Sequence, residues 1–378
     1  MKLIQSVKLQ INLRKVLWIG LLWAAAGVVD SFFTQLLGQS SQLQFTAAYN
    51  FHIYFITNLL GYGSGGLIAG FVLVFLLKDR FQNQPFFINL LIKSLVIIGL
   101  SFGMSLVGYV AISCLRVKAG ILDEAVWQET WAIFLSPYHL KNTALGFMLV
   151  MGTIVLLQVA DKYGPGVLPG IWFGKYHLPR QEERIFMFLD MKSSTTIAER
   201  LGHIQFHNLL NDFFRDIAEP VVYTRGEIYQ YVGDEVVITW EMKWGLLNAN
   251  CIRSFYAIRE TIAKRAYRYR EKYGLVPEFK AGLHCGQVTT GVIGLVKRDL
   301  VHSGDVTNTS ARIQDKCNEF GVKILLSKLL LDKLKLPPHS FVAKKMGDID
   351  LRGKSEKVML YTLEEEVGIT DASQRQLV

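Results

Sequence analysis

Long, predominantly apolar stretches separated by short polar segments make up the first half of the chain, and shorter apolar patterns follow in the second half. The long stretches cover residues 16–37, 51–77, 85–115 and 138–160. Each is long enough to cross ~30 Å of hydrocarbon as an α-helix. The pattern predicts an N-terminal all-α membrane domain of four transmembrane helices, with the lipid bilayer as a partner.

Charges between the stretches predict their orientation. Four basic residues and no acid lie before the first stretch, and the loop after the second carries Lys78 and Arg80, whereas the loop at 38–50 has no charge. Basic loops usually stay in the cytoplasm. Arg116 and Lys118 oppose this assignment, but their loop also holds three acids. We therefore expect a multi-pass protein of the cell (inner) membrane whose N-terminus and second half are cytoplasmic.

Two ionisable residues fall inside the stretches, Asp30 in the first and Lys93 in the third. Charge within a bilayer is costly and often functional. The two residues could pair, or Lys93 could extend its side chain to the nearby membrane surface. The glycine-rich run at 61–66 in the second stretch would allow close helix packing.

The second half begins with a buried-strand pattern at 185–189 that ends on Asp190. Ser193, Ser194 and Thr195 then precede an amphipathic helix pattern. An acid at a strand end and a helix N-terminus beside it suit a cation and a phosphate chain, respectively. We therefore expect Asp190 to bind a metal and the Ser/Thr cluster to bind phosphate.

A second acid stands at a predicted hairpin turn in "YQYVGDEVVITW", residues 229–240. Strand-like residues flank Gly233 and Asp234 there. An acid at such a turn is more often simply solvated, so a role for Asp234 depends on Asp190 lying close to it. If adjacent strands bring the two together, they can share a pair of Mg²⁺ ions. Glu235 is expected to point away from the metals.

Composition supports a membrane domain followed by a charged, soluble one. Mean hydropathy is +0.25, with 51% hydrophobic and 19% charged residues, which is too apolar for an ordinary soluble chain. The four cysteines lack CxxC spacing, so neither a disulfide framework nor a zinc site is indicated. We expect no nucleic-acid partner.

Four segments carry a resemblance to a known family: "FLDMKSSTTIAE" (188–199), "YQYVGDEV" (229–236), "HSGDVTNTSARIQ" (302–314) and "DLRGKSEKVMLY" (350–361). Together they resemble the class III nucleotidyl cyclase catalytic domain, over about 182–363. The resemblance implies a C-terminal α+β, ferredoxin-like domain. It also implies that Asp190 and Asp234 bind two Mg²⁺ or Mn²⁺ ions per active site, that Asn308 and Arg312 orient the ribose and stabilise the transition state, and that Lys354 binds the triphosphate.

The implied activity is that of an adenylate cyclase, a phosphorus–oxygen lyase that converts ATP to 3′,5′-cyclic AMP and pyrophosphate at a homodimer interface. The base-reading positions of the family correspond to Gln230 and Val301, which match neither its adenine pair nor its guanine pair. His302 could substitute for Val301. ATP is favoured because a guanine site without an acid would leave guanine N1–H poorly satisfied. A guanylate cyclase, or a nucleotide-binding receptor module of low activity, remains the alternative.

The resulting domain boundaries are residues 1–161 for the membrane domain, 162–181 for a coupling linker, 182–366 for the catalytic domain and 367–378 for a C-terminal tail.

Overall fold

The computed structural model describes residues 2–40, 51–78, 80–81, 84–163, 174–296, 298–336, 341–350 and 357–365. The chain divides into two compact units. The first, Gln5–Tyr163, is named the helical unit here, and the second, formed mainly from Gly164 onward, is named the sheet unit.

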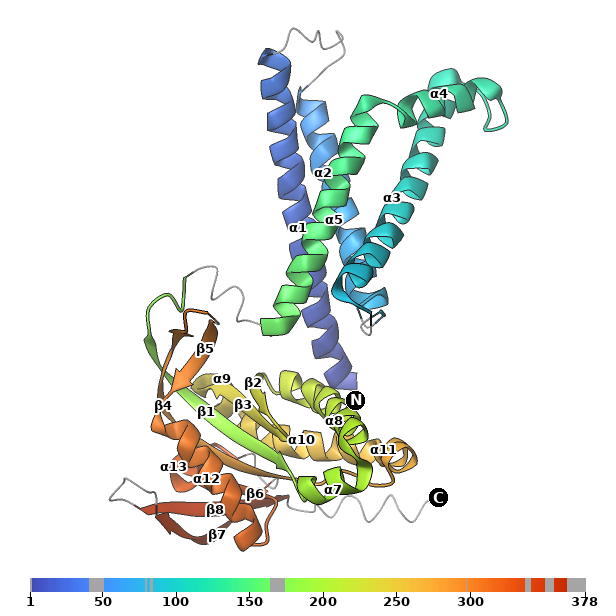
Figure 1. The fold of residues 1–378 in the computed structure, drawn as a ribbon. Coiled ribbons are helices and arrows are strands. Elements are labelled where there is room, and N and C mark those ends of the chain that lie inside the picture. The colour runs from blue at the N-terminus through green and yellow to red at the C-terminus, as the bar shows by residue number, and fades with distance from the viewer. Residues whose placement is uncertain are drawn as a thin grey trace, which may run out of the picture. The chain divides into compact units, whose positions relative to one another are not determined.

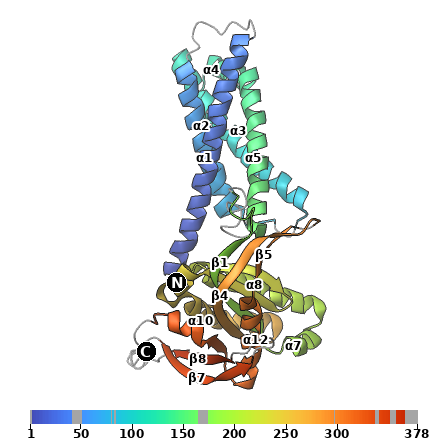
Figure 2. The same cartoon turned by 90° about the vertical axis from the view of Figure 1, so that its left-hand side faces the viewer.

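The helical unit contains four helices that are long and apolar enough to cross a membrane, as predicted (Figure 2). Their apolar spans are Leu9–Leu36, Phe55–Leu76, Phe86–Val117 and His139–Asp161. These spans belong to α1 (Lys2–Ser40), α2 (Phe51–Phe71) with the π-helical turn η1 (Val72–Leu76), α3 (Phe86–Val117) and α5 (Pro137–Tyr163). A shorter helix that the sequence pattern did not indicate, α4 (Glu124–Phe134), lies between α3 and α5.

Close packing of α1 against α2 uses part of the glycine-rich run. A Cβ added to Gly66 would lie 2.7 Å from the Cβ of Trp23, whereas one added to Gly61 would meet no atom within 4 Å. The Trp23 indole also donates to Thr153 Oγ1 on α5 at 2.9 Å. Glycine is therefore required at position 66 because the backbone of α2 lies directly against the Trp23 side chain.

Asp30 does not pair with Lys93. Its two carboxylate oxygens each accept a hydrogen bond from Lys141 Nζ at 2.9 Å, and Asn58 donates to Asp30 at 3.2 Å. The reason is the antiparallel course of the helices: Asp30 lies late in α1 and Lys141 early in α5, whereas Lys93 lies near the opposite end, at the start of α3. The buried Asp30 carboxylate thus has an ammonium partner in Lys141, which lowers the cost of its charge in an apolar environment.

The sheet unit is built on a mixed sheet with the strand order β2-β3-β1-β4-β6-β8-β7, and β5 pairs with β4 (Figure 1). The strands are β1 (Arg180–Met191), β2 (Glu227–Val232), β3 (Glu235–Glu241), β4 (Phe279–Ile293), β5 (Asp299–Ser303), β6 (Ile324–Ser327), β7 (Phe341–Asp350) and β8 (Lys357–Glu365). The helices are α7 (Ser194–Leu201), α8 (His203–Tyr223), α9 (Met242–Leu246) with the 3-10 turn η2 (Leu247–Ala249), α10 (Asn250–Lys264), α11 (Ala266–Tyr273), α12 (Asp305–Glu319) and α13 (Lys328–Lys333).

Alternation along the central strand β1 separates two buried layers. Ile185, Met187 and Leu189 belong to the main core, which α8 and α10 cover. Phe186 and Phe188 face the other side of the sheet, where they pack with Val306 at the start of α12. Side chains two apart on a strand share a face, so Asp190 emerges on the side of α12.

Candidate active site

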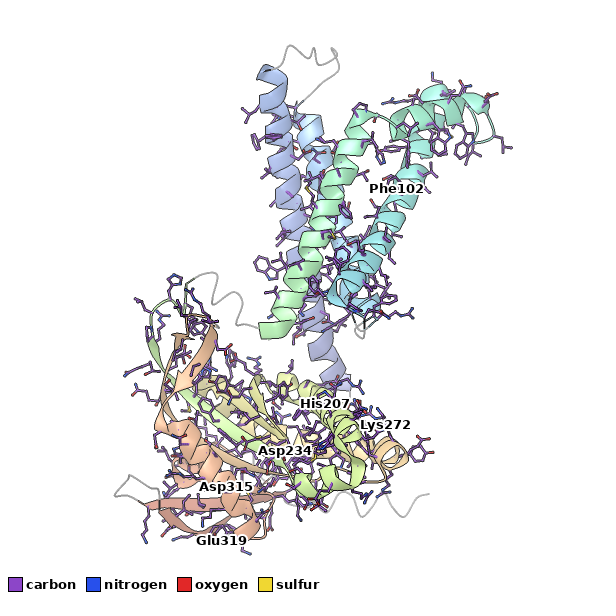
Figure 3. All side chains as sticks on the ribbon, viewed as in Figure 1. Phe102, His207, Asp234, Lys272, Asp315 and Glu319 are labelled. Carbon is purple, nitrogen blue, oxygen red and sulfur yellow. The ribbon has the colours of Figure 1, made fainter. Side chains whose placement is uncertain are left out.

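The two predicted metal-binding acids come together at one end of the sheet. β1 and β3 are antiparallel neighbours, and their register places Asp190 opposite Glu235. Asp234, labelled in Figure 3, immediately precedes Glu235 in the β2–β3 turn. Gly233 of the same turn has a φ of 63°. Burial and the neighbouring Asp234 carboxylate raise the pKa of Asp190. Two acids this close therefore disfavour their own ionisation, which is the electrostatic condition that a bound cation relieves.

Glu235 lies nearer to this pair than the sequence suggested. Residues directly opposite in an antiparallel ladder project on the same face of the sheet, so Glu235 shares a face with Asp190 and does not point away from it. Burial, together with the charges of Asp190, Asp315 and Asp234, raises the pKa of Glu235 to about 7. The expectation failed because it considered the turn alone, without the register of the neighbouring strand.

Two residues that the sequence did not single out hold Asp190. Lys280 on β4 places its Nζ 3.4 Å from Asp190 Oδ2, and Gln314 on α12 donates to the same oxygen at 3.1 Å. Gln314 is buried, with 3% of its surface exposed. The side chain of Asp190 is therefore fixed from a neighbouring strand and from the helix that covers it.

The donor chemistry of this site fits Mg²⁺ or Mn²⁺. Magnesium is usually bound by one or two carboxylates together with water and substrate phosphates. Within the described residues, no group of three or more His, Cys, Asp or Glu side chains is arranged to hold a metal ion. Asp190 and Asp234 thus match a site completed by substrate, and not a closed structural site.

The predicted phosphate-binding cluster lies immediately after β1. Ser193 adopts a left-handed conformation (φ 58°), and α7 begins at Ser194. Non-glycine residues adopt this conformation only at a cost, which often marks a functional turn. Ser193 and Thr195 are exposed and Ser194 is half-buried. The first backbone N–H groups of α7 therefore lie only a few residues from Asp190 along the chain.

The predicted transition-state residues lie on α12, which packs tightly on β4. A Cβ added to Gly282 of β4 would lie 2.2 Å from the backbone N of Gln314. At 3.6 residues per turn, Asn308 and Arg312 lie about 120° and 160° around the helix from Gln314. Since Gln314 faces Asp190, the structure places these two residues on a different side of α12 from the acids of the same chain.

The predicted base-reading positions lie on β2 and β5, two strands that the Tyr229 side chain connects. Tyr229, the extra residue at an irregularity in β2, accepts a hydrogen bond through its hydroxyl from the His302 backbone N–H on β5 at 3.2 Å. Gln230 and Val301, the sequence neighbours of these two residues, are exposed and half-buried, respectively.

The His302 side chain points into the protein. Its Nδ1 lies 2.7 Å from Thr290 Oγ1, and its ring packs against Phe186 and Tyr229. Burial and the nearby Arg184 charge lower the pKa of His302 to about 4. His302 is therefore neutral at physiological pH and supports Tyr229. Lys354, the predicted triphosphate ligand, lies outside the described residues.

Comparison with known proteins identifies the family of this chain. The family profile described as "Adenylate and Guanylate cyclase catalytic domain" matches residues 177–365. Adenylate cyclase 2 of Rhizobium meliloti (strain 1021) is 32% identical over 317 residues, which cover 80% of this chain and 84% of that protein. The aligned part, 80% of this chain, is longer than the sheet unit, so this similarity extends well into the helical unit. An adenylate cyclase of Anabaena cylindrica is 22% identical over 65% of this chain. The matched region is 48% of that longer protein.

A solved structure, that of a bacterial light-regulated adenylyl cyclase, superposes with a TM-score of 0.51 at 20% identity and covers 64% of this chain and 70% of that one. At this identity the likeness concerns the fold, and it agrees with the predicted α+β catalytic domain.

Proposed function

Because the chain belongs to the adenylate and guanylate cyclase catalytic-domain family, we propose that it is a membrane-bound adenylate cyclase, which converts ATP to 3′,5′-cyclic AMP and pyrophosphate. The observation that carries this proposal is the pairing of Asp190 with Asp234 at the end of β1, directly before the N-terminus of α7. The most similar relative described above is named an adenylate cyclase, which favours ATP.

Each residue of the site has a role that its chemistry supports. Asp190 and Asp234 would hold two divalent cations, and Lys280 and Gln314 fix the side chain of Asp190. When bound, such cations lower the pKa of the attacking 3′-hydroxyl and neutralise the leaving pyrophosphate. The backbone at Ser193, Ser194 and Thr195 receives phosphate oxygens, and Lys354 is proposed to add a positive charge there.

A second copy of the chain completes this site in our proposal. Asn308 and Arg312 lie about a third to half a turn away from the side of α12 that faces Asp190. They therefore serve the acids of a partner, where the planar guanidinium of Arg312 stabilises charge on the α-phosphate. The β4–β5 connection offers apolar contact surface, since Leu295 and Val296 are 88% and 102% exposed. A two-fold homodimer then has two equivalent sites.

In this proposal the base is read beside the contact that joins Tyr229 of β2 to His302 of β5. Gln230 is exposed there and can both donate a hydrogen bond to adenine and accept one from it. Val301 supplies apolar contact, and the His302 ring packs against Tyr229. The prediction is that Gln230→Glu lowers turnover of ATP more than turnover of GTP, because a carboxylate accepts from guanine N1–H but cannot donate to adenine N1. Parallel assays with both nucleotides measure this, and an unchanged ratio would place base reading elsewhere.

The helical unit anchors the enzyme in the membrane, with the sheet unit in the cytoplasm and the domain boundaries given above. Its four apolar helices and the basic residues at their ends support this topology. Confinement of both copies to one membrane plane favours the dimer.

The decisive experiment is an assay of the purified full chain with ATP or GTP and Mg²⁺ or Mn²⁺, with the cyclic products separated. We expect cyclic AMP to dominate and to require a divalent cation. Preferential formation of cyclic GMP would establish the guanylate alternative, and no cyclic product under any condition would contradict the proposed activity.

A further inference from the structure

A buried polar network joins β1, β2, β4 and β5 of the sheet unit, and the chemistry proposed above does not use it. At its centre is Arg184 of β1, which is 1% exposed. Its Nε donates to Glu182 Oε2 at 3.1 Å, and its Nη1 donates to Glu227 Oε2 at 2.9 Å. Glu227 is the first residue of β2, and β3 lies between β2 and β1 in the sheet. The Arg184 side chain therefore spans β3 and ties the start of β2 to the central strand.

From Glu182 the network continues to β4, the other neighbour of β1. Thr290 of β4 donates through Oγ1 to Glu182 Oε2 at 3.3 Å, and this Oγ1 lies 2.7 Å from His302 Nδ1 on β5. Burial raises the pKa of Glu182, but Arg184 and Lys175 act in the opposite direction and bring it below its ordinary value. Glu182 is thus a carboxylate, which only accepts hydrogen bonds. Since the Thr290 hydroxyl donates to Glu182, its oxygen accepts from His302 Nδ1–H, and the network runs in one direction from β5 to β1.

Both ends of this network lie beside the predicted base-reading positions. Glu227 and Gln230 lie on β2, and between them Tyr229 is the extra residue at the irregularity in that strand. An irregularity of this kind redirects the side chains next to it. His302 directly follows Val301 on β5 and donates its backbone N–H to the Tyr229 hydroxyl at 3.2 Å. The position of Gln230 relative to Val301 therefore depends on how β2 and β5 are held.

We propose that the buried Arg184–Glu182 pair positions the two strands that read the purine base, and so contributes to the preference for one nucleotide. It holds β2 through Glu227 and β5 through Thr290 and His302. The proposal rests on the base-reading role given to these strands under Proposed function. Hydrogen bonds weaken steeply as their distance and angle depart from the optimum. A small displacement of either strand therefore reduces discrimination between adenine and guanine, although neither member of the pair touches the base.

The test measures kcat/KM for ATP and for GTP with the full chain. Glu227→Ala removes the tie to β2, and Thr290→Val removes the tie to β5 with little change in shape. Each should bring the ATP-to-GTP ratio of kcat/KM closer to one by about three- to tenfold, the effect of weakening one hydrogen bond to the base. KM for ATP should rise with little change in kcat, whereas inhibition by pyrophosphate, which has no base, should stay the same. Thr290→Ser keeps the hydroxyl and should retain the wild-type ratio.

Glu183→Ala is the matched control. Glu183 follows Glu182 on β1 but projects from the opposite face of the sheet, where its partner is Lys333 at 3.6 Å. Loss of folded enzyme lowers turnover of both nucleotides equally, so it does not move the ratio. The proposal would be overturned by an unchanged ratio in Glu227→Ala and Thr290→Val, by an equal shift in Glu183→Ala, or by a wild type that uses both nucleotides equally, and the cyclase assignment would stand. No cyclic product from the wild type would instead contradict the proposed function, and this inference with it.

Discussion

The carboxylates of Asp190 and Asp234 are the residues on which the proposed chemistry depends most directly. Burial and the neighbouring Asp234 carboxylate raise the pKa of Asp190, although Lys280 acts in the opposite direction. In the proposed mechanism such a pair contributes little to folding and much to cation binding.

Replacement of either acid by asparagine should therefore separate activity from stability. For Asp190→Asn or Asp234→Asn we expect turnover to fall on the order of a hundredfold or more, since cations supply several kcal/mol to such reactions. The melting temperature should stay at or above that of the wild type, because the repulsion is removed. Cyclase assays and thermal unfolding measure the two effects. Activity close to wild type in either variant would contradict the site.

His302 provides a pH test away from the acids. Its pKa is lowered to about 4 by burial and by Arg184, with Glu182 acting in the opposite sense, whereas an exposed histidine titrates near ~6.5. As the pH falls from 6.5 toward 4, the unfolded chain binds a proton that the folded chain excludes, so stability falls. At pH 5 the loss relative to neutral pH is about 2 kcal/mol. Above pH 6.5 this contribution is fully present.

The measurement is unfolding of the sheet unit within the full chain between pH 5 and neutral pH, followed by tryptophan fluorescence. His302→Gln keeps a hydrogen-bonding side chain near Thr290 but does not titrate, so the pH dependence should become shallower. An unchanged slope would mean that other groups determine acid stability.

Part of the candidate site could be predicted from the sequence, and part could not, for a physical reason. Asp190 and Asp234 follow from a strand end and a turn, which are local features. Lys280 and Gln314 could not be found in this way, because their contacts with Asp190 depend on which strand and which helix become its neighbours. The orientation of Glu235 was wrong for the same reason, since it is set by the register of β3 against β1.

At the scale of elements, the contact between α12 and β4 determines where Gln314, Asn308 and Arg312 lie. Gly282 permits that contact, because an added Cβ would overlap the helix backbone and not a flexible side chain. Gly286 also lies close to this helix, but its added Cβ would be 2.8 Å from a side-chain atom, Cγ2 of Val306. Two glycines four apart in a strand pattern are a local signal of such an approach, although the partner helix is not evident from sequence.

Gly282→Ala should therefore displace α12. We expect destabilisation of about 1–3 kcal/mol from overpacking, together with a loss of turnover larger than the loss of folded protein. Gly291→Ala on the same strand is the control, because its nearest atom, from Pro179, would lie at 3.4 Å. Unfolding curves and cyclase assays of the two variants provide the comparison. Equal behaviour of both would show that the close approach does not control the site.

The four long helices were predictable because uninterrupted apolar length is a strong signal. Helix α4 was not, because it is short (11 residues) and carries Trp127 and Trp131 among polar residues. The partner of Asp30 was also beyond the sequence, since it depends on which ends of the helices lie together.

At the scale of the whole molecule, the proposed dimer makes a prediction that no single-chain site shares. Co-expression of Asp190→Ala with Arg312→Ala should restore partial activity, although each homodimer is inactive. One of the two sites in the mixed dimer combines intact acids from one chain with an intact arginine from the other. Differently tagged copies allow the mixed dimer to be purified and assayed. If it forms but stays inactive, each chain completes its own site.

Two sides of helix α12 serve different active sites in the proposed dimer. One side reaches Asp190 of its own chain through Gln314, and in the proposed dimer another side carries Arg312 to the partner's acids. Each copy of α12 then contributes residues to both active sites of the dimer. A tilt of α12 that moves Gln314 in one active site therefore also moves Arg312 in the other, and the sheet need not change. The enzyme would thus have built-in communication between its halves, and the first nucleotide to bind would alter the affinity for the second.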